Sequence, residues 1–415
     1  MRYVILACLA AGLLFPGFAQ KVVIEYWDAT TQASREWWRA TMVETFNKLY
    51  PNIEVRLLVI PFAEYFTKLQ AAFAAGTVPD VFAVDCPLVP RYAEVENVLL
   101  ELDEYFKYEM DDFVEPSLID ATWKGHFYAV PYCQGGQAIY YNKQMFAELG
   151  LQPPTDPENA WTWEYVIEIA KRLTKDLDGD GTPDIWGIVL EQVDRPYQVN
   201  VLLESKGARV ISPDGTTVRG YLNSPEAIEA ATFYWKLFNE WKVAPRASLP
   251  ELFGQGKAAM FWGGPAQIAL WTTKYPDLEW GVMPLPYFEG GRKVSPCGAW
   301  HLGIYKNTPH VAEALQFVRF MTNEAAIDLN YLITNYLPVR RSTYQIFDIF
   351  NTYPIGVFAK QLFTTASPRP RTVAYLEYEE ILRTAYRNIM SGADPATELN
   401  NAVVLIDRVL SRYMK

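Results

Sequence analysis

The sequence predicts an α/β protein of two lobes joined by a hinge. Strand patterns alternate with helical patterns in the N-terminal part, as in a parallel sheet with crossover helices. The mature chain of about 396 of the 415 residues exceeds what one hydrophobic core usually supports. Three extended segments marked by glycine and proline interrupt the helix-rich remainder. Two lobes with several connections explain all three observations.

Local signals define the expected elements. Pro51 ends the first helical pattern, because proline cannot continue a helix, and Gly76 closes the second as a C-cap residue. The expected strands of this part are 22–27, 53–59 and 81–84, and its expected helices are 34–50 and 64–75. Further helices are expected near 144–149, 163–174, 196–206, 225–240, 248–255 and 309–322, and the chain beyond 341 is expected to be mostly helical.

The three extended segments, 134–142, 291–305 and 333–341, are interpreted as crossings between the lobes. The first lobe then comprises residues 20–136 and 291–337, and the second comprises 137–290 and 338–415. A hinge of this kind allows the lobes to close around a ligand.

The first residues have the pattern of a secretory signal peptide. Arg2 gives a positive start, the run from Val4 to Phe15 is apolar, and small residues precede a charged segment. The run is too short to span a bilayer, which takes about 20 apolar residues. We expect cleavage after residue 19, with Cys8 in the discarded peptide, and a mature protein outside the cytoplasmic membrane, periplasmic or at the cell surface.

Composition excludes several classes of protein. The net charge is −11 and lysine and arginine are scattered, which argues against a nucleic-acid partner. Cys86, Cys133 and Cys297 remain after signal removal, so at least one is unpaired in a single chain. Neither the cysteines nor the three histidines have the spacing of a zinc site, and we expect no cofactor.

Aromatic residues make up 15% of the chain, and many lie in glycine- or proline-rich turns. Much of this content must be core. A flat ring at a strand end can also face the C–H patches of a sugar, while carboxylates and amides bind its hydroxyls. The composition therefore favours a carbohydrate ligand.

Several segments, in order along the chain, resemble the extracellular solute-binding proteins of bacterial ABC importers, specifically the sugar-binding group related to maltose-binding protein. Each segment alone is a weak signal, but together they span nearly the whole mature chain. They are Thr77-Val78-Pro79-Asp80-Val81, Ala138-Ile139-Tyr140-Tyr141-Asn142-Lys143, Trp161-Thr162-Trp163-Glu164, Phe253-Gly254-Gln255-Gly256-Lys257-Ala258-Ala259-Met260, Gly298-Ala299-Trp300-His301-Leu302-Gly303-Ile304 and Tyr336-Leu337-Pro338-Val339-Arg340. Ala160 stands where the family usually has proline before its Thr-Trp motif.

The resemblance implies a periplasmic-binding-protein fold of two α/β lobes, a ligand held in the cleft between them, and docking of the closed form on the permease subunits of an importer. We expect a monomer that binds a mono- or oligosaccharide and catalyses no reaction. The alternatives are a binder of an anionic polyol, such as a glycerophosphodiester, and a secreted glycosidase, which would need two opposed carboxylates.

Polar residues near strand ends are the first candidates for ligand binding. Asp28 and Asp85 follow expected strands, and ligands of open α/β sheets bind beyond the carboxyl ends of strands. Each could instead cap a helix or a turn. Gln134 lies beside two glycines in the first crossing, where its amide could bind a sugar hydroxyl pair. Tyr65 could offer its ring, although core packing explains this residue better.

Two tryptophans and an arginine complete the candidate ligand site. Trp262 precedes two glycines, and Gly298 and Trp300, both candidates, lie in the second crossing. The matching positions line the cleft in the family that the chain resembles. Arg371 lies in a late segment that often contributes cleft residues in relatives. An arginine there could bind sugar hydroxyls or a phosphate, which keeps the anionic polyol open.

The segment Asp176 to Asp184 resembles the first half of a calcium loop, with carboxylates at Asp176, Asp178, Asp180 and Asp184. Gly187 stands where an EF-hand has its final glutamate. We expect an Asp-rich turn without metal, with a structural calcium ion as the alternative.

Overall fold

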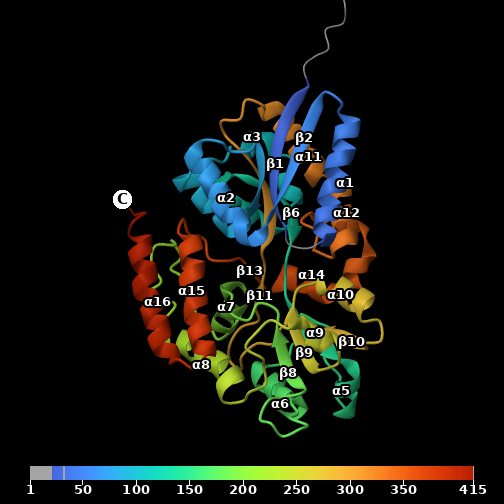
Figure 1. The fold of residues 1–415 in the computed structure, drawn as a ribbon, viewed down its shortest axis with the longest axis vertical. Coiled ribbons are helices and arrows are strands. Elements are labelled where there is room, and N and C mark those ends of the chain that lie inside the picture. The colour runs from blue at the N-terminus through green and yellow to red at the C-terminus, as the bar shows by residue number, and fades with distance from the viewer. Residues whose placement is uncertain (1–20, 31–32, 415) are drawn as a thin grey trace, which may run out of the picture.

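The computed structural model describes residues 21–30 and 33–414 (Figure 1). The predicted signal peptide, with Cys8, lies outside the described residues. Two sheets stand one above the other in Figure 1, and each is covered by helices.

The first sheet has the strand order β2-β1-β3-β12-β6. β1 pairs in parallel with β2 and β3, whereas β12 runs antiparallel to both β3 and β6. The helices α1, α11 and α12 pack together beside this sheet, and α2 contacts β1 and β2. The elements of this lobe are β1 (Val22–Thr30), α1 (Ala33–Leu49), β2 (Ile53–Pro61), α2 (Phe62–Ala75), β3 (Val81–Asp85), α3 (Asp103–Phe106), α4 (Glu115–Ala121), β4 (Thr122–Trp123), β5 (His126–Phe127), β6 (Ala129–Gln134), β12 (Ala299–Ile304), α11 (Val311–Thr322) and α12 (Glu324–Thr334).

The second sheet has the order β10-β7-β9-β8, in which only β8 and β9 are parallel. A short pair of strands, β11 and β13, lies between the two larger sheets. The elements of this part are β7 (Ala138–Asn142), α5 (Lys143–Glu148), α6 (Trp163–Leu173), β8 (Trp186–Leu190), α7 (Pro196–Ser205), α8 (Pro225–Asn239), α9 (Pro250–Gly254), β9 (Ala258–Gly263), α10 (Gln267–Lys274), β10 (Trp280–Met283), β11 (Ser295–Pro296), α13 (Arg341–Ile346), α14 (Ile355–Thr364), β13 (Ala366–Ser367), α15 (Tyr375–Met390) and α16 (Pro395–Leu410).

Short helical turns complete the description: Cys86–Leu88, Arg91–Val95, Met110–Asp112, Pro157–Asn159 and Asp348–Asn351. The expected helices near 163–174, 196–206 and 225–240 form within one residue of the expected bounds. The expected helix at 248–255 is shorter, because Pro250 starts it and Gly256 follows it in a left-handed conformation.

The chain passes between the two sheets where the extended segments were predicted. β6 belongs to the first sheet and β7 to the second, with only residues 135–137 between them. After β10 in the second sheet, the chain returns to place β12 between β3 and β6. The exact residues at which one lobe ends and the other begins stay a prediction.

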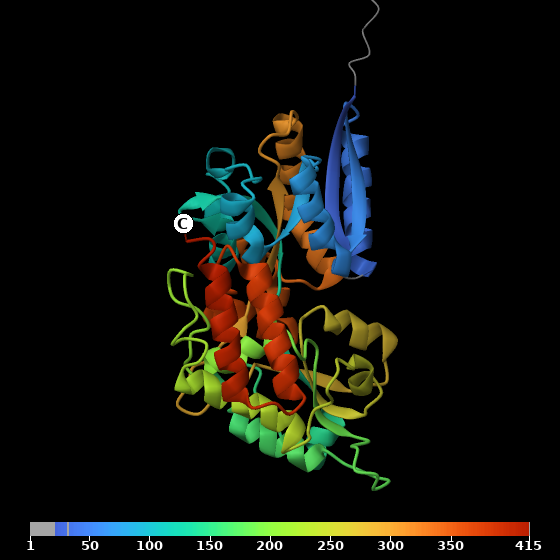
Figure 2. The same ribbon diagram turned by 60° about the vertical axis from the view of Figure 1, so that its left-hand side comes forward.

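The C-terminal helices α15 and α16 connect the lobes on one side of the molecule. They pack on each other and on α8 of the second lobe, and Figure 2 shows them side by side in red with their upper ends beside the first lobe. There the Arg91 guanidinium lies 3.0 Å from the Glu377 carboxylate, and the Tyr413 hydroxyl donates to the same carboxylate at 3.0 Å. The late segment that precedes α15 is thereby held at the boundary between the lobes.

Candidate functional site

A cavity of about 360 Å³ lies between the lobes. Both sheets and all three crossings contribute to its wall. The lining residues are Phe62, Asp85, Gly135, Gly136, Gln137, Glu191, Gln192, Arg195, Tyr197, Gly264, Pro265, Ala266, Gly298, Trp300, Tyr336 and Arg369.

Strand ends place several of the lining residues. Asp85 is the last residue of β3, Glu191 follows β8, and Gly264 follows β9. Since β8 and β9 are parallel, their carboxyl ends meet at the same edge of the second sheet. The cavity therefore lies where open α/β sheets bind ligands, beyond the carboxyl ends of their strands.

An ion pair between Asp85 and Arg369 forms part of the cavity wall. The Arg369 Nη1 atom donates to Asp85 Oδ2 at 3.0 Å, and Nη2 donates to Asp85 Oδ1 and, at 3.1 Å, to the Cys86 sulfur. Both side chains are about nine-tenths buried. Burial opposes the charged form of Arg369, but the Asp85 carboxylate, together with Cys86 and Tyr375, outweighs burial and holds the pKa of the guanidinium well above its usual value.

The other charged groups of the wall also have partners. Arg195 binds Glu379 at 2.6 Å, and its guanidinium lies 5.5 Å from the centre of the Phe62 ring. Glu191 accepts hydrogen bonds from the Gly264 N–H at 2.8 Å and from the Gln267 amide at 2.6 Å. Burial raises the pKa of Glu191, although these two donors oppose the shift. The wall thus offers many polar atoms: its two arginines are paired with carboxylates, whereas Glu191 is held by neutral donors.

Trp300 supplies an aromatic face at the cavity. Its side chain comes from β12, and the Arg35 guanidinium lies 4.3 Å from the centre of its ring. Phe62 meets the ring edge-on at 6.3 Å. The residue is 8% exposed, so it is packed by the protein and reaches the cavity with a small part of its surface.

Gln134 joins the three crossings directly behind the cavity. Its side-chain oxygen accepts from the backbone N–H groups of Gly135 at 2.9 Å and Gly298 at 2.7 Å. Its backbone pairs with Leu337 in both directions, at 2.8 and 2.9 Å. Gly298 also lets Tyr197 and Arg369 pack closely against the second crossing, because a Cβ there would lie 3.1 Å from the Tyr197 ring and 3.3 Å from Arg369.

Three of the predicted site residues, Asp85, Gly298 and Trp300, line the cavity. Gln134 does not: its amide is fully buried and is used to hold the crossings together. We therefore assign it a positioning role in place of the expected contact with ligand.

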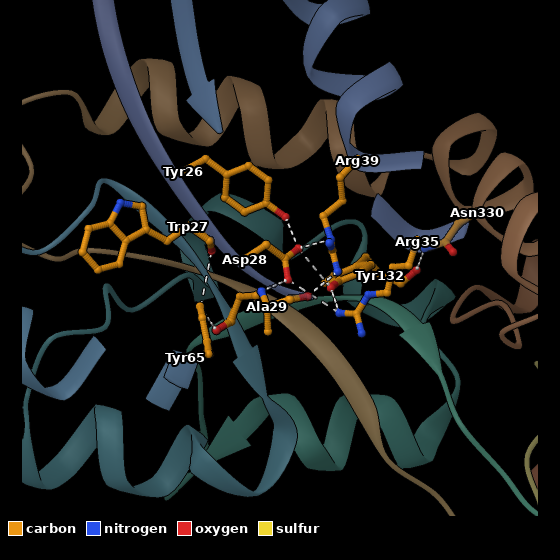
Figure 3. Close-up of polar contacts among 10 residues, drawn as sticks. Tyr26, Trp27, Asp28, Ala29, Arg35, Arg39, Tyr65, Tyr132 and Asn330 are labelled. Carbon is orange, nitrogen blue, oxygen red and sulfur yellow. Dashed lines mark hydrogen bonds and ion pairs between the residues drawn. The ribbon is translucent and has the colours of Figure 1, made fainter. Parts of the chain in front are cut away.

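The structure places Asp28 in a buried ion cluster, not at the cavity (Figure 3). Arg39 Nε lies 2.6 Å from Asp28 Oδ2, and Arg35 Nη2 lies 3.8 Å from Oδ1. The Tyr26 hydroxyl and the Ala29 N–H also donate to this carboxylate. Asp28 is buried here because both arginines of α1 are buried against β1. Asp28 supplies the opposite charge that burial of the arginines requires.

Tyr65 and Trp262 also belong to the core. The Tyr65 hydroxyl donates to the Ala83 carbonyl at 2.6 Å, and the side chain is fully buried. The Trp262 ring is fully buried and packs 4.9 Å from Trp163, centre to centre. Gly264, the second of the two glycines after Trp262, lines the cavity, whereas the tryptophan itself points into the core.

Arg371 is held outside the cavity lining. Its guanidinium donates to the Thr122 carbonyl and lies 5.5 Å from the centre of the Trp123 ring. Arg369, two residues earlier, reaches the cavity instead. Within this late segment, Arg369 lines the cavity and Arg371 does not.

The Asp-rich loop lies between α6 and β8, in an exposed part of the second lobe. Carboxylate oxygens of Asp176, Asp178 and Asp184 lie within 4.8 Å of one another, a group that does not include Asp180. Asp176 accepts from the Gly179 and Gly181 N–H groups, and Asp184 accepts from that of Leu177. These bonds shape the loop without an ion, and a structural calcium ion here stays a prediction.

Several lining residues were not predicted from the sequence. Glu191 follows a buried strand as Asp85 does, and that same signal could have found it. Arg195 and Tyr197 lie at the start of α7 and Phe62 at the start of α2, where no local pattern separates a ligand contact from a helix terminus.

The comparisons with known proteins agree with this geometry. The model of the family "Bacterial extracellular solute-binding protein" matches residues 28–328, which is more than half of the chain. The chain belongs to the bacterial extracellular solute-binding proteins. Among the described residues of this solute-binding protein, no helix combines the length and apolarity needed to cross a membrane.

Its relatives are distant but cover most of the chain. A putative binding protein of Brucella abortus is 23% identical over 384 residues, which is 89% of each chain. The maltotriose-binding protein of Pyrococcus abyssi is 26% identical over 309 residues, 72% of this chain and 62% of the relative. The sn-glycerol-3-phosphate-binding periplasmic protein of Rhizobium meliloti is 23% identical over 426 residues, 95% of each chain.

Solved structures show the same two-lobed fold. A substrate-binding protein of Listeria monocytogenes in complex with cycloalternan superimposes with a TM-score of 0.80 at 23% identity, over 95% of this chain and 99% of the other. The maltose/maltodextrin-binding domain of Bdellovibrio bacteriovorus, bound to maltotriose, gives 0.80 at 21% identity, over 94% and 100%. At these identities the likeness establishes the periplasmic-binding-protein fold, as expected from the sequence.

Two further buried groups near the site titrate away from their usual range. Burial raises the pKa of Asp120 to about 7, although Arg369 and Arg371 oppose the shift. Burial lowers the pKa of His301 to about 4. Asp120 lies in α4, is 3% exposed, and its Oδ2 atom has no hydrogen-bond partner among the described residues.

We predict that Asp28→Asn destabilises the protein by about 3–5 kcal/mol, because removing one member of a buried ion pair leaves the other charge uncompensated. Chemical denaturation measures the loss. Asp277→Asn, an exposed position, is the matched control and should leave the midpoint unchanged. An Asp28→Asn variant as stable as the control would contradict the structural role of Asp28.

We predict that the Asp120→Asn variant gains stability relative to the native protein as the pH rises from 4 to 8. The folded-state pKa of Asp120 is raised, so the stability that its protonated form contributes is full below the unfolded-state pKa of ~4. That stability is lost as the pH rises through about 7. The asparagine variant cannot ionise and avoids this loss. Thermal unfolding of both proteins at several pH values measures the difference, and a difference independent of pH would contradict it.

Proposed function

We propose that this protein binds a neutral mono- or oligosaccharide between its lobes, by lobe closure, and delivers it to the membrane permease of an ABC importer. The observation that carries the proposal is the wall of the cavity. It combines aromatic side chains from both lobes with polar groups, and both of its arginines are already paired with carboxylates. Saccharides offer apolar C–H faces and many uncharged hydroxyls, which match such a wall.

The paired charges favour this ligand over an anionic polyol. A phosphate would need a cation free to bind it, and the two arginines that line the cavity hold Asp85 and Glu379. Arg371, the residue expected to bind a phosphate, lies outside the lining. The relative from Rhizobium meliloti, named as an sn-glycerol-3-phosphate-binding protein, keeps the anionic polyol as the alternative to be tested.

The arrangement of carboxylates supports binding without catalysis. A glycosidase needs two carboxylates that flank its substrate. Asp28 is fully buried in its ion cluster, Asp85 is paired with Arg369, and Glu191 accepts hydrogen bonds from Gly264 and Gln267. We propose that the protein is a receptor, exported from the cytoplasm and acting as a monomer.

A thermal-shift screen of neutral saccharides and phosphorylated polyols tests the proposal. A ligand that binds only the folded state, at a hundredfold excess over Kd, adds about 2.7 kcal/mol of stability. We predict stabilisation by at least one neutral saccharide and none by glycerol 3-phosphate. Stabilisation by phosphorylated polyols alone would contradict the proposed ligand class, and turnover of an oligosaccharide would contradict the receptor.

Trp300→Ala and Trp300→Phe locate the binding site. The alanine variant should weaken binding of the stabilising saccharide at least tenfold, and phenylalanine should restore part of the loss because it keeps a ring. Trp262→Phe, in the core, is the matched control and should leave the affinity unchanged. Unchanged affinity in Trp300→Phe and in the folded fraction of Trp300→Ala would contradict a site at this cavity.

A further inference from the structure

A second cluster of metal-ligating side chains lies in the first lobe, away from the cavity. It consists of Glu101, Asp103 and His126, whose ligand atoms all lie within 4.8 Å of one another. The His126 Nδ1 atom is 3.6 Å from Asp103 Oδ2 and 3.8 Å from Glu101 Oε2. Both separations are within the range of an ion pair but exceed that of a hydrogen bond, so neither carboxylate is hydrogen-bonded to the imidazole.

The separations are close to those of atoms that share one metal ion. Ligand atoms about 2.0–2.2 Å from a tetrahedral zinc ion lie roughly 3.3–3.6 Å from one another. Movements of a few tenths of an ångström would bring the three atoms to that geometry. Such movements are available, because all three side chains are more than a third exposed.

Each carboxylate is already oriented by a bond from outside the cluster. The Tyr128 hydroxyl donates to Glu101 Oε1 at 3.1 Å, which leaves Oε2 toward the imidazole. The Phe127 N–H donates to Asp103, and the Leu102 N–H donates to the Phe127 carbonyl at 2.7 Å. Outer hydrogen bonds of this kind orient the ligands in metal sites.

The charge of the cluster also favours a cation. Two carboxylates face one imidazole, and the neighbouring Lys124 binds Glu94 instead, at 2.8 Å. A divalent ion would neutralise both carboxylates. Imidazole nitrogen together with carboxylate oxygen suits a transition ion such as zinc, whereas the all-carboxylate loop at 176–184 has the oxygen donors that calcium prefers.

We propose that Glu101, Asp103 and His126 bind a zinc-class divalent ion, with water as the remaining ligand. The ion ties the β4–β5 hairpin to the start of α3. The same hairpin supplies Thr122, whose carbonyl accepts from Arg371, two residues after Arg369. The site therefore stabilises the part of the first lobe against which the late segment packs, and it does not depend on the proposed ligand of the cavity.

Isothermal titration of the full chain, stripped with EDTA, with zinc chloride tests the site. We expect binding near one equivalent, and a rise in Tm that EDTA reverses. His126→Gln and, separately, Glu101→Gln should each weaken this binding at least ~10-fold, the scale seen when a metal site loses a supporting group. Both substitutions are at exposed positions and should leave the zinc-free Tm nearly unchanged.

Asp176→Asn is the matched control, because it alters the other acidic cluster and should leave zinc binding unchanged. Zinc affinity that falls in Asp176→Asn but not in His126→Gln would overturn the proposal. Absence of zinc binding, or a stability effect of His126 that depends on pH and not on zinc, would overturn it as well, since a simple ion pair of protonated His126 would then explain the cluster.

Discussion

The ion pair between Asp85 and Arg369 is the interaction on which the character of the cavity depends. It joins the end of a strand in the first lobe to the segment before the C-terminal helices, and it is about nine-tenths buried. The two charges neutralise each other, so the pair presents polar atoms to the cavity without adding net charge. A buried pair of this kind contributes little net stability, because desolvation of the two ions offsets their attraction. Under the proposed function its consequence is selectivity, because both arginines that line the cavity among the described residues already hold carboxylates.

A second constraint fixes the geometry around this pair. Gln134 binds the backbone of Gly298 and pairs with Leu337, so one residue holds the three crossings at a single point. Since Gly298 also borders Tyr197 and Arg369, the hinge and the cavity wall are built from the same residues. Rotation of one lobe against the other would therefore pivot beside the ligand. This arrangement explains how ligand contacts and lobe closure can be coupled in so small a site.

Much of the fold could be predicted from the sequence, because strand and helix patterns and their proline and glycine boundaries are local signals. The candidate site was predictable only in part. Asp85 ends β3 and Asp28 lies within β1, which are parallel strands of one sheet. Of the two, only Asp85 lines the cavity. The difference arises from Arg39, which packs from α1 onto Asp28 and is a tertiary contact that no local pattern encodes. The choice between Arg369 and Arg371 likewise depends on what each side chain meets in the other lobe.

The most direct test measures the affinity of the native protein and of Asp85→Asn for a neutral saccharide and for its phosphate monoester. The account predicts that the native protein prefers the neutral saccharide, with an affinity that changes little with salt. Asp85→Asn leaves Arg369 uncompensated, so it should lose affinity for the neutral saccharide and gain affinity for the phosphate, steeply dependent on salt. Tight binding of the phosphate by the native protein, or the same preference in both proteins, would contradict the account.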